Sequence, residues 1–199
     1  MDTKTQAKNY DAIASHWDGV HFNRNNGIEQ HERALRLVKN KVRAIDVGCG
    51  SSGRILDILV KHGFDAEGLD FSQEMLKLAQ QRHPKLTFHH ADICEWNFSK
   101  SYDFISAWDS VWHAPLCEQE AILIKLCNAL NPNGVLIYTS GAVDEAGDGS
   151  NPFLGQELYH AALGITKILD TIAKSGCVCR HLENDDWPNT HLYLIVEKL

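Results

Sequence analysis

A glycine-rich turn between two apolar segments is the feature that most constrains the fold of this 199-residue chain. A short apolar run at residues 42–47 leads into Asp46-Val-Gly-Cys-Gly-Ser-Ser-Gly53, and residues 53–62 then show apolar side chains at helical spacing. Glycines let the backbone bend sharply and lie close to a ligand. A strand, this G-x-G-x-x-G spacing and a helix in that order are typical of nucleotide-binding α/β proteins.

The rest of the chain alternates between strand and helix patterns, which also indicates an α/β sheet protein. We expect the strands at residues 42–47, 64–70, 86–90, 103–108, 135–140, 177–183 and 191–197. We expect the helices at residues 53–62, from the capping Ser72 to before Pro84, at 116–130 and at 165–174. The last two strands are separated by a short turn, so we expect an antiparallel pair.

Composition and charge narrow the class of protein. Hydrophobic residues make up 44% of the chain, but no apolar run approaches the ~20 residues that cross a bilayer. The polar N-terminal ten residues lack the apolar core of a signal peptide, so we expect a cytoplasmic protein without a membrane partner. The six cysteines form no Cys-x-x-Cys pair and have no matching His spacing, which predicts free thiols and no metal site.

The formal net charge of -7, with no basic cluster, argues against a nucleic-acid partner. A tRNA-modifying enzyme with a local basic patch remains an alternative. An acidic balance is compatible with neutral, cationic or thiol substrates and selects none of them. The sequence does not indicate an oligomeric state.

Two acidic residues bear on the identity of the ligand. Asp70 ends the second expected strand, where a carboxylate can accept hydrogen bonds from ribose hydroxyls. Asp46 directly precedes the glycines. A carboxylate there would repel the pyrophosphate that NAD sites hold at a helix N-terminus, but it would suit a cofactor with an amine or a sulfonium. The charge of Asp46 therefore favours S-adenosylmethionine over NAD.

The ordered motifs resemble those of class I S-adenosylmethionine-dependent methyltransferases. They are Asp46-Val-Gly-Cys-Gly-Ser-Ser-Gly53, Leu69-Asp-Phe-Ser72, Ala91-Asp-Ile93 and Leu130-Asn-Pro-Asn-Gly-Val135. The resemblance runs from about residue 10 to residue 199. It implies a Rossmann-like, doubly wound, mostly parallel seven-stranded sheet with an antiparallel last strand and helices on both faces.

We expect one domain over residues 1–199 with four parts. These are an N-terminal helical lid at 1–40, a cofactor-binding core at 41–140, a substrate-cap linker at 141–164, and a C-terminal helix and hairpin at 165–199. Residues 141–155 are rich in Gly, Asp, Asn and Ser, which predicts a mobile connection within the linker.

The resemblance also implies a set of cofactor-binding residues. Gly48 and Gly50 would line the methionine part of the cofactor, with Asp46 near its amino group, and Asp70 would bind the ribose. Phe71 would stack on the adenine, Asp92 would accept a hydrogen bond from the exocyclic amine, and Ile93 would add an apolar wall. The segment Tyr10-Asp-Ala-Ile-Ala-Ser-His-Trp-Asp18 resembles the family's lid helix, so Tyr10 would close over the methionine end. The alternative is that Tyr10 is a packing aromatic.

Ligands of open α/β sheets bind outside the carboxyl ends of the strands. Residues 107–115 follow the fourth expected strand and combine Trp108, Asp109, Trp112 and His113. We predict that Trp108 contacts the cofactor and that Trp112 contacts the acceptor. Asp109 is expected to contact either the methionine amine of the cofactor or the acceptor, and His113 is the candidate base or a further acceptor contact. Turn, packing and capping roles are the alternatives.

Tyr159 and His160 lie in the expected cap, where either could contact the acceptor or serve in packing. The chain lacks the N/D-P-P-Y/F/W motif of methyltransferases that act on the amino groups of bases. It also lacks the Pro-Cys nucleophile of cytosine-C5 enzymes and a convincing set of magnesium ligands. A metal-free methyltransferase acting on a small molecule by in-line displacement is therefore the leading hypothesis. A non-catalytic S-adenosylmethionine-binding module and a nicotinamide-linked oxidoreductase are the alternatives.

Overall fold

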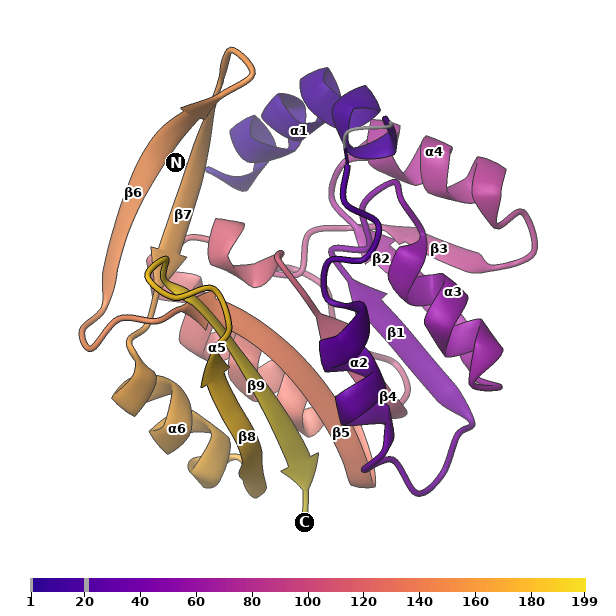
Figure 1. Cartoon of the computed structure of the whole chain (residues 1–199), viewed down its shortest axis with the longest axis vertical. Helices are drawn as coiled ribbons and strands as arrows, with labels where there is room; N and C mark the ends of the chain where they lie inside the picture. The colour runs from indigo at the N-terminus through magenta and orange to yellow at the C-terminus, as the bar shows by residue number, and fades with distance from the viewer. Residues whose placement is uncertain (1, 20–21) are drawn as a thin grey trace.

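The residues that the structure describes, 2–19 and 22–199, form one seven-stranded sheet in the order β3-β2-β1-β4-β5-β9-β8 and a separate two-stranded hairpin (Figure 1). This structure is a computed structural model. The strands of the main sheet are β1 (Arg43–Val47), β2 (Asp65–Asp70), β3 (Thr87–His90), β4 (Tyr102–Ala107), β5 (Leu130–Gly141), β8 (Cys177–Asn184) and β9 (His191–Lys198). β9 runs antiparallel to both of its neighbours, β5 and β8, whereas strands β1 to β5 pair in parallel. The predicted fold class is confirmed.

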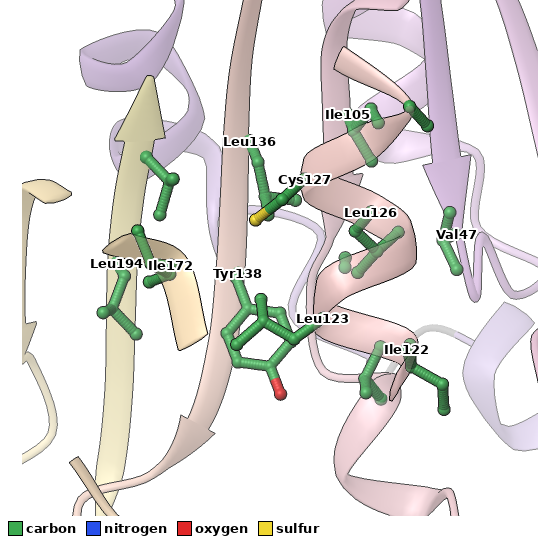
Figure 2. Packing of buried hydrophobic residues seen from close by; sticks show 14 of the residues in the cluster. Val47, Ile105, Ile122, Leu123, Leu126, Cys127, Leu136, Tyr138, Ile172 and Leu194 are labelled. Atoms are coloured by element: carbon green, nitrogen blue, oxygen red, sulfur yellow. The ribbon is translucent and has the colours of Figure 1, made fainter. Parts of the chain in front are cut away.

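Helices cover both faces of the main sheet because each sheet face is apolar. The helices are α1 (Thr3–Asp18), α2 (Ile28–Leu35), α3 (Arg54–Lys61), α4 (Gln73–Arg82), α5 (Leu116–Asn128) and α6 (Ile165–Lys174). Buried residues of α5 and α6 share one core cluster with the sheet, and buried residues of α2, α3 and α4 share the other. Figure 2 shows the first cluster, in which α5 contributes Ile122, Leu123, Leu126 and Cys127.

Local sequence signals explain where the elements begin and end. The side chain of Ser72 accepts a hydrogen bond from the backbone N–H of Met75 at 3.2 Å, which caps α4 as predicted. Gly63, with a φ of 91°, follows the end of α3. β5 begins at Leu130 instead of the predicted residue 135, because Leu130 already pairs with Tyr102 of β4.

The prediction of a mobile connection at residues 141–155 is wrong. Strands β6 (Gly147–Phe153) and β7 (Gln156–Ala162) pair in antiparallel register over seven residue pairs. The turn between them uses Leu154 and Gly155 with positive φ values of 50° and 79°. Turn-forming residues suggested a loop, but the backbone pairing and the burial of alternate parts of β7 against α1 and α5 override that local preference. The hairpin stands beside α1 and pairs with no strand of the main sheet (Figure 1).

Other expectations concern the whole chain. Residues 1, 20 and 21 of the predicted lid segment lie outside the described residues, and α1 and α2 occupy most of the remainder. Within residues 2–19 and 22–199, no helix has the length and hydropathy needed to span a bilayer. All six cysteines are free thiols in this structure.

Candidate cofactor site

A cavity of about 330 Å³ lies where the parallel strands end. Because β1 to β4 are parallel, their carboxyl ends meet at one edge of the sheet, and the turns that follow them share that edge. Those turns line the cavity with residues 48–52, 70–71, 91–93 and 108–114. Helix α1 covers it with Tyr10 and Trp17. The structure therefore brings together segments that are up to a hundred residues apart in the sequence.

The glycine turn has little room for side chains on one side and open space on the other. Gly48 has a φ of 75°, and a Cβ there would lie 2.2 Å from the Cβ of Ser110. Gly53 has a φ of 66°, and its added Cβ would lie 2.4 Å from the ring of His83. A Cβ at Gly50, which also has positive φ, would meet no atom within 4 Å. Gly48 and Gly53 thus permit close packing, and Gly50 leaves space for a ligand.

Asp70 organises the turn and faces the cavity. Its carboxylate accepts hydrogen bonds from the backbone N–H of Gly50 at 2.8 Å and of Ser72 at 2.9 Å. Burial raises the pKa of Asp70 to about 6, although these two backbone hydrogen bonds oppose the shift. Asp70 is therefore mostly ionised at pH 7 and lines the cavity as an acceptor. This placement is compatible with the predicted ribose contact.

Asp46 is buried behind the wall of the cavity. It is only 3% exposed, and it does not belong to the residues that line the cavity. Its Oδ1 accepts a hydrogen bond from the Ser106 hydroxyl at 2.7 Å. Burial raises the pKa of Asp46 to about 6, while the Ser106 hydrogen bond and the positive charge of Arg54 lower it. Asp46 therefore lies near the end of the buried strand β1, where it interacts electrostatically with Arg54, a residue that lines the cavity.

Apolar and aromatic side chains form another part of the cavity wall. Phe71, Asp92 and Ile93 all line the cavity, which is compatible with the predicted adenine contacts. The ring of Tyr10 lies 5.9 Å from that of Phe71 in a tilted arrangement. One oxygen of Asp92 accepts a hydrogen bond from the backbone N–H of Cys94 at 2.9 Å, which fixes the carboxylate at the end of β3. This part of the cavity can hold a flat heteroaromatic ring with a polar edge.

Three buried polar atoms in the wall have no hydrogen-bond partner among residues 2–19 and 22–199. They are the hydroxyls of Ser51 and Ser110 and the indole nitrogen of Trp17. Buried polar groups are almost always satisfied in folded proteins. Their presence in one cavity indicates that a polar ligand supplies the missing partners, so the residues present fit a nucleoside cofactor.

A polar network that sequence reasoning missed lies at the β4 side of the cavity. Asn26 accepts a hydrogen bond from the indole N–H of Trp108 at 3.2 Å and donates one to Asp109 at 3.1 Å. The Nε of Arg54 donates to the backbone carbonyl of Asn26 at 2.9 Å. Asn26, Trp108, Asp109 and Arg54 all line the cavity. Arg54 directly follows the last glycine of the turn, so its position in the sequence offered a signal, whereas Asn26 offered none.

The predicted acceptor residues divide into two groups. Trp112 and His113 line the cavity with Asp109, which has a φ of 51°. Tyr159 and His160 do not line it. Tyr159 is buried with its hydroxyl accepting from the backbone N–H of Leu116, and His160 is exposed on β7. Their side chains are therefore placed for packing and solvent in this structure, which does not support the predicted contact with an acceptor.

A second, more polar cleft of about 620 Å³ adjoins the cavity. The two share Asn26 and Asp109 as lining residues. Its acidic residues and its one histidine are Glu29, Asp109, Asp185, Asp186 and His191. Four carboxylates against one imidazolium leave this cleft with a negative charge. Among the described residues no group of three or more His, Cys, Asp or Glu side chains is arranged to hold a metal ion.

His191 is expected to make stability depend on pH in the alkaline range. Burial lowers its pKa, but hydrogen bonds to Asp109 and Asp185 outweigh burial and raise the pKa from its ordinary value of 6.5 to about 9. The charged ring therefore stabilises the fold fully below pH 6.5, and this contribution is lost as the pH rises through 9. Because the ion pairs are partly exposed, we expect a fall of about 1–2 kcal/mol in the free energy of unfolding. Urea unfolding of the wild type and His191→Gln between pH 6.5 and 9.5 measures it; an equal fall in the variant would contradict the assignment to His191.

Comparisons with known proteins agree with this geometry. A family model described as "Methyltransferase domain" matches residues 44–134, the stretch that contains β1 to β4 and the glycine turn. Phosphoethanolamine N-methyltransferase 2 of Caenorhabditis elegans is 24% identical over 91% of this chain and 44% of that protein. Trans-aconitate 2-methyltransferase of Yersinia pseudotuberculosis is 39% identical over 46% of this chain and 35% of that protein. The chain thus spans less than half the length of these two relatives.

The whole fold also matches a solved structure. A S-adenosylmethionine-dependent methyltransferase from Clostridium acetobutylicum aligns with a TM-score of 0.73 at 15% identity, covering 95% of this chain and 98% of that one. A methyltransferase sequence model therefore matches most of the strands and turns that build the cavity, and the complete chain has the fold of an S-adenosylmethionine-dependent methyltransferase.

Proposed function

We propose that this protein transfers a methyl group from S-adenosylmethionine to a small molecule by in-line displacement. The observation that carries the proposal is the cavity in which the glycine turn, the Asp70 carboxylate and the Asp109–His113 segment meet. When bound there, the cofactor supplies an electrophilic methyl group on a sulfonium. The chain's own residues bind the cofactor and the acceptor, orient them toward each other and exclude water.

The walls match the three parts of such a cofactor. Phe71 and Ile93 supply apolar surface for the adenine, and Asp70 supplies acceptors for the ribose hydroxyls. Arg54 and Asp109 line the same cavity with opposite charges. A cation and an anion at one end suit a zwitterionic amino-acid group, with Arg54 toward its carboxylate and Asp109 toward its ammonium.

The acidic cleft beside the cavity is the proposed entry for the acceptor. Methyl transfer requires the acceptor atom within about 3–3.5 Å of the methyl carbon, so its site must adjoin the cofactor. The cleft meets this requirement because Asn26 and Asp109 line both spaces. Its negative charge favours an acceptor that carries an amine. The two curated relatives are named for phosphoethanolamine and trans-aconitate, which are small molecules of different acceptor chemistry.

Transfer of labelled methyl tests the proposal. The protein is incubated with S-adenosylmethionine labelled in its methyl group and, in separate arms, with small amines, small carboxylates and tRNA. We expect label in a small-molecule arm, with amines preferred, and inhibition by S-adenosylhomocysteine. Calorimetric binding of the cofactor without product in any arm would favour the non-catalytic module, and product in the tRNA arm alone would favour the macromolecular alternative. Tighter binding of NAD than of S-adenosylmethionine would refute the cofactor.

A variant of a residue that lines only the cleft tests the acceptor site separately from the cofactor cavity. Asp186 lines the cleft but not the cofactor cavity. Asp186→Asn is expected to raise KM for an amine acceptor by about two- to fivefold, as for an exposed ion pair. Cofactor affinity should stay unchanged. An unaltered KM would place the acceptor outside this cleft.

A further inference from the structure

His113 makes hydrogen bonds at both ring nitrogens. Nδ1 lies 2.7 Å from the backbone carbonyl of Tyr159 on β7. Nε2 lies 2.7 Å from the hydroxyl of Tyr10 on α1 and 2.8 Å from the indole N–H of Trp112. The Nε2 of Gln6 lies 3.4 Å from Nδ1, a longer contact than the one to the carbonyl. The ring therefore joins the helix that covers the cavity, the loop after β4 and the hairpin.

The partners determine which nitrogen carries the proton. A carbonyl oxygen can only accept, so Nδ1 must donate to Tyr159. An indole N–H can only donate, so Nε2 must accept from Trp112 and, by its lone pair, also from the hydroxyl of Tyr10. Burial raises the pKa of Tyr10, which keeps this hydroxyl protonated and able to donate. His113 is thus a neutral ring in a fixed orientation.

This arrangement is poorly suited to a general base. The lone pair of Nε2 already faces two donors, and Nδ1 faces an acceptor that it cannot lose without leaving a buried carbonyl unpaired. Burial also lowers the pKa of His113 to about 4, whereas an efficient base has a pKa near the working pH. The prediction that His113 removes a proton from the acceptor is therefore replaced by a different role.

We propose that His113 is a positioning residue that holds the hydroxyl of Tyr10, and with it helix α1, over the cofactor cavity. Tyr10 lines that cavity beside Phe71, so the position of its ring determines how far the cavity is closed. The inference rests on the proposed function for its catalytic meaning. The hydrogen bond itself exists without a cofactor, so it can be tested on the free protein.

Paired substitutions separate positioning from base chemistry. His113→Asn can keep the donor to Tyr159 but has no acceptor at the place of Nε2, whereas His113→Gln can place an amide oxygen there and cannot act as a base. His113→Asn is expected to weaken binding of S-adenosylhomocysteine about tenfold in calorimetry, the size of one buried hydrogen bond. His113→Gln should bind within about threefold of the wild type. Tyr10→Phe removes the same bond from the other side and should match His113→Asn, with no further loss in the double variant.

Hydrogen exchange of the free protein gives a readout that does not depend on methyl transfer. Amides of residues 3–18 are expected to exchange faster in His113→Asn and Tyr10→Phe than in the wild type. Asn9→Ala is the matched control, because Asn9 donates to the backbone carbonyl of Glu157 at 2.7 Å and so also links α1 to β7 without lining the cavity. It should leave S-adenosylhomocysteine affinity within about threefold.

Two results would overturn the proposal. One is unchanged exchange at residues 3–18 in both His113→Asn and Tyr10→Phe. The other is equal loss of turnover in His113→Gln and His113→Asn with wild-type affinity for S-adenosylhomocysteine, which is the behaviour of a base. If no acceptor is found and the proposed function fails, the exchange and affinity measurements still decide whether His113 positions Tyr10.

Discussion

Asp70→Asn is expected to weaken the binding of S-adenosylhomocysteine by about 10- to 100-fold, or about 1–3 kcal/mol. The carboxylate of Asp70 accepts from the backbone N–H groups of Gly50 and Ser72 and presents its remaining acceptor capacity to the cavity. An asparagine has one acceptor oxygen, and its NH₂ group would face one of those two N–H donors. The substitution therefore removes ribose acceptors and also loosens the glycine turn. Calorimetry at pH 7.5 measures the change.

The same strand offers a matched control for Asp70. Asp65 is exposed at the opposite end of β2, so Asp65→Asn removes an equal charge far from the cavity. Its affinity for S-adenosylhomocysteine should equal that of the wild type. Equal affinities in both variants would exclude Asp70 from the cofactor site, and equal losses in both would point to net charge as the cause.

Gly48→Ala is expected to lower the free energy of unfolding by about 2–5 kcal/mol. A residue with a Cβ pays about 1–2 kcal/mol in the left-handed region, where Gly48 lies with a φ of 75°. The new methyl group would also lie 2.2 Å from the Cβ of Ser110, and overpacking of this kind costs about 1–3 kcal/mol. Relief of that clash must shift the turn or the loop after β4. Both line the cavity, so cofactor affinity should fall as well.

Gly63→Ala separates the cost of the left-handed backbone conformation from the cost of the clash with Ser110. Gly63 also has a positive φ, 91°, but a Cβ there would meet no atom within 4 Å. Gly63→Ala should therefore cost only about 1–2 kcal/mol and leave cofactor affinity unchanged. Urea unfolding of the three proteins tests this. A loss in Gly48→Ala no larger than in Gly63→Ala would show that Ser110 moves away at no cost and that the clash has no energetic weight.

The sequence predicted the parallel half of the fold because each signal there is local. The glycine turn, the Ser72 cap and the short apolar runs indicate where a strand ends and a helix begins. The hairpin of β6 and β7 could not be predicted in this way. Its stability comes from backbone pairing and from contacts with α1, which begins more than a hundred residues earlier.

The same distinction applies to the site. Asp70, Phe71, Asp92 and Ile93 line the cavity because each lies at the end of a strand, or within three residues after it, and the sequence reveals where these strands end. Asn26 comes from a loop with no pattern, and it reaches the cavity because Gly27 packs against Trp108 so closely that a Cβ would lie 2.8 Å from the indole. That Asp46 does not line the cavity could not be predicted, because strand position does not reveal whether a side chain faces the cavity or lies buried against Ser106. His113 lines the cavity, but its hydrogen-bond partners on other segments of the chain, which the sequence does not reveal, decide its chemistry.

The hairpin leaves and rejoins the fold at one point. The backbone N–H of Ile165 donates to the carbonyl of Val143 at 2.9 Å, so the two ends of the inserted segment are hydrogen-bonded to each other. The main sheet has no strand from this segment. The hairpin is therefore modular. The segment between Val143 and Ile165 can be replaced by one of another length and sequence while β5 and α6 keep their places. The contacts of the hairpin with α1, α5 and β5, and with His113 through the carbonyl of Tyr159, would need to be rebuilt in the replacement.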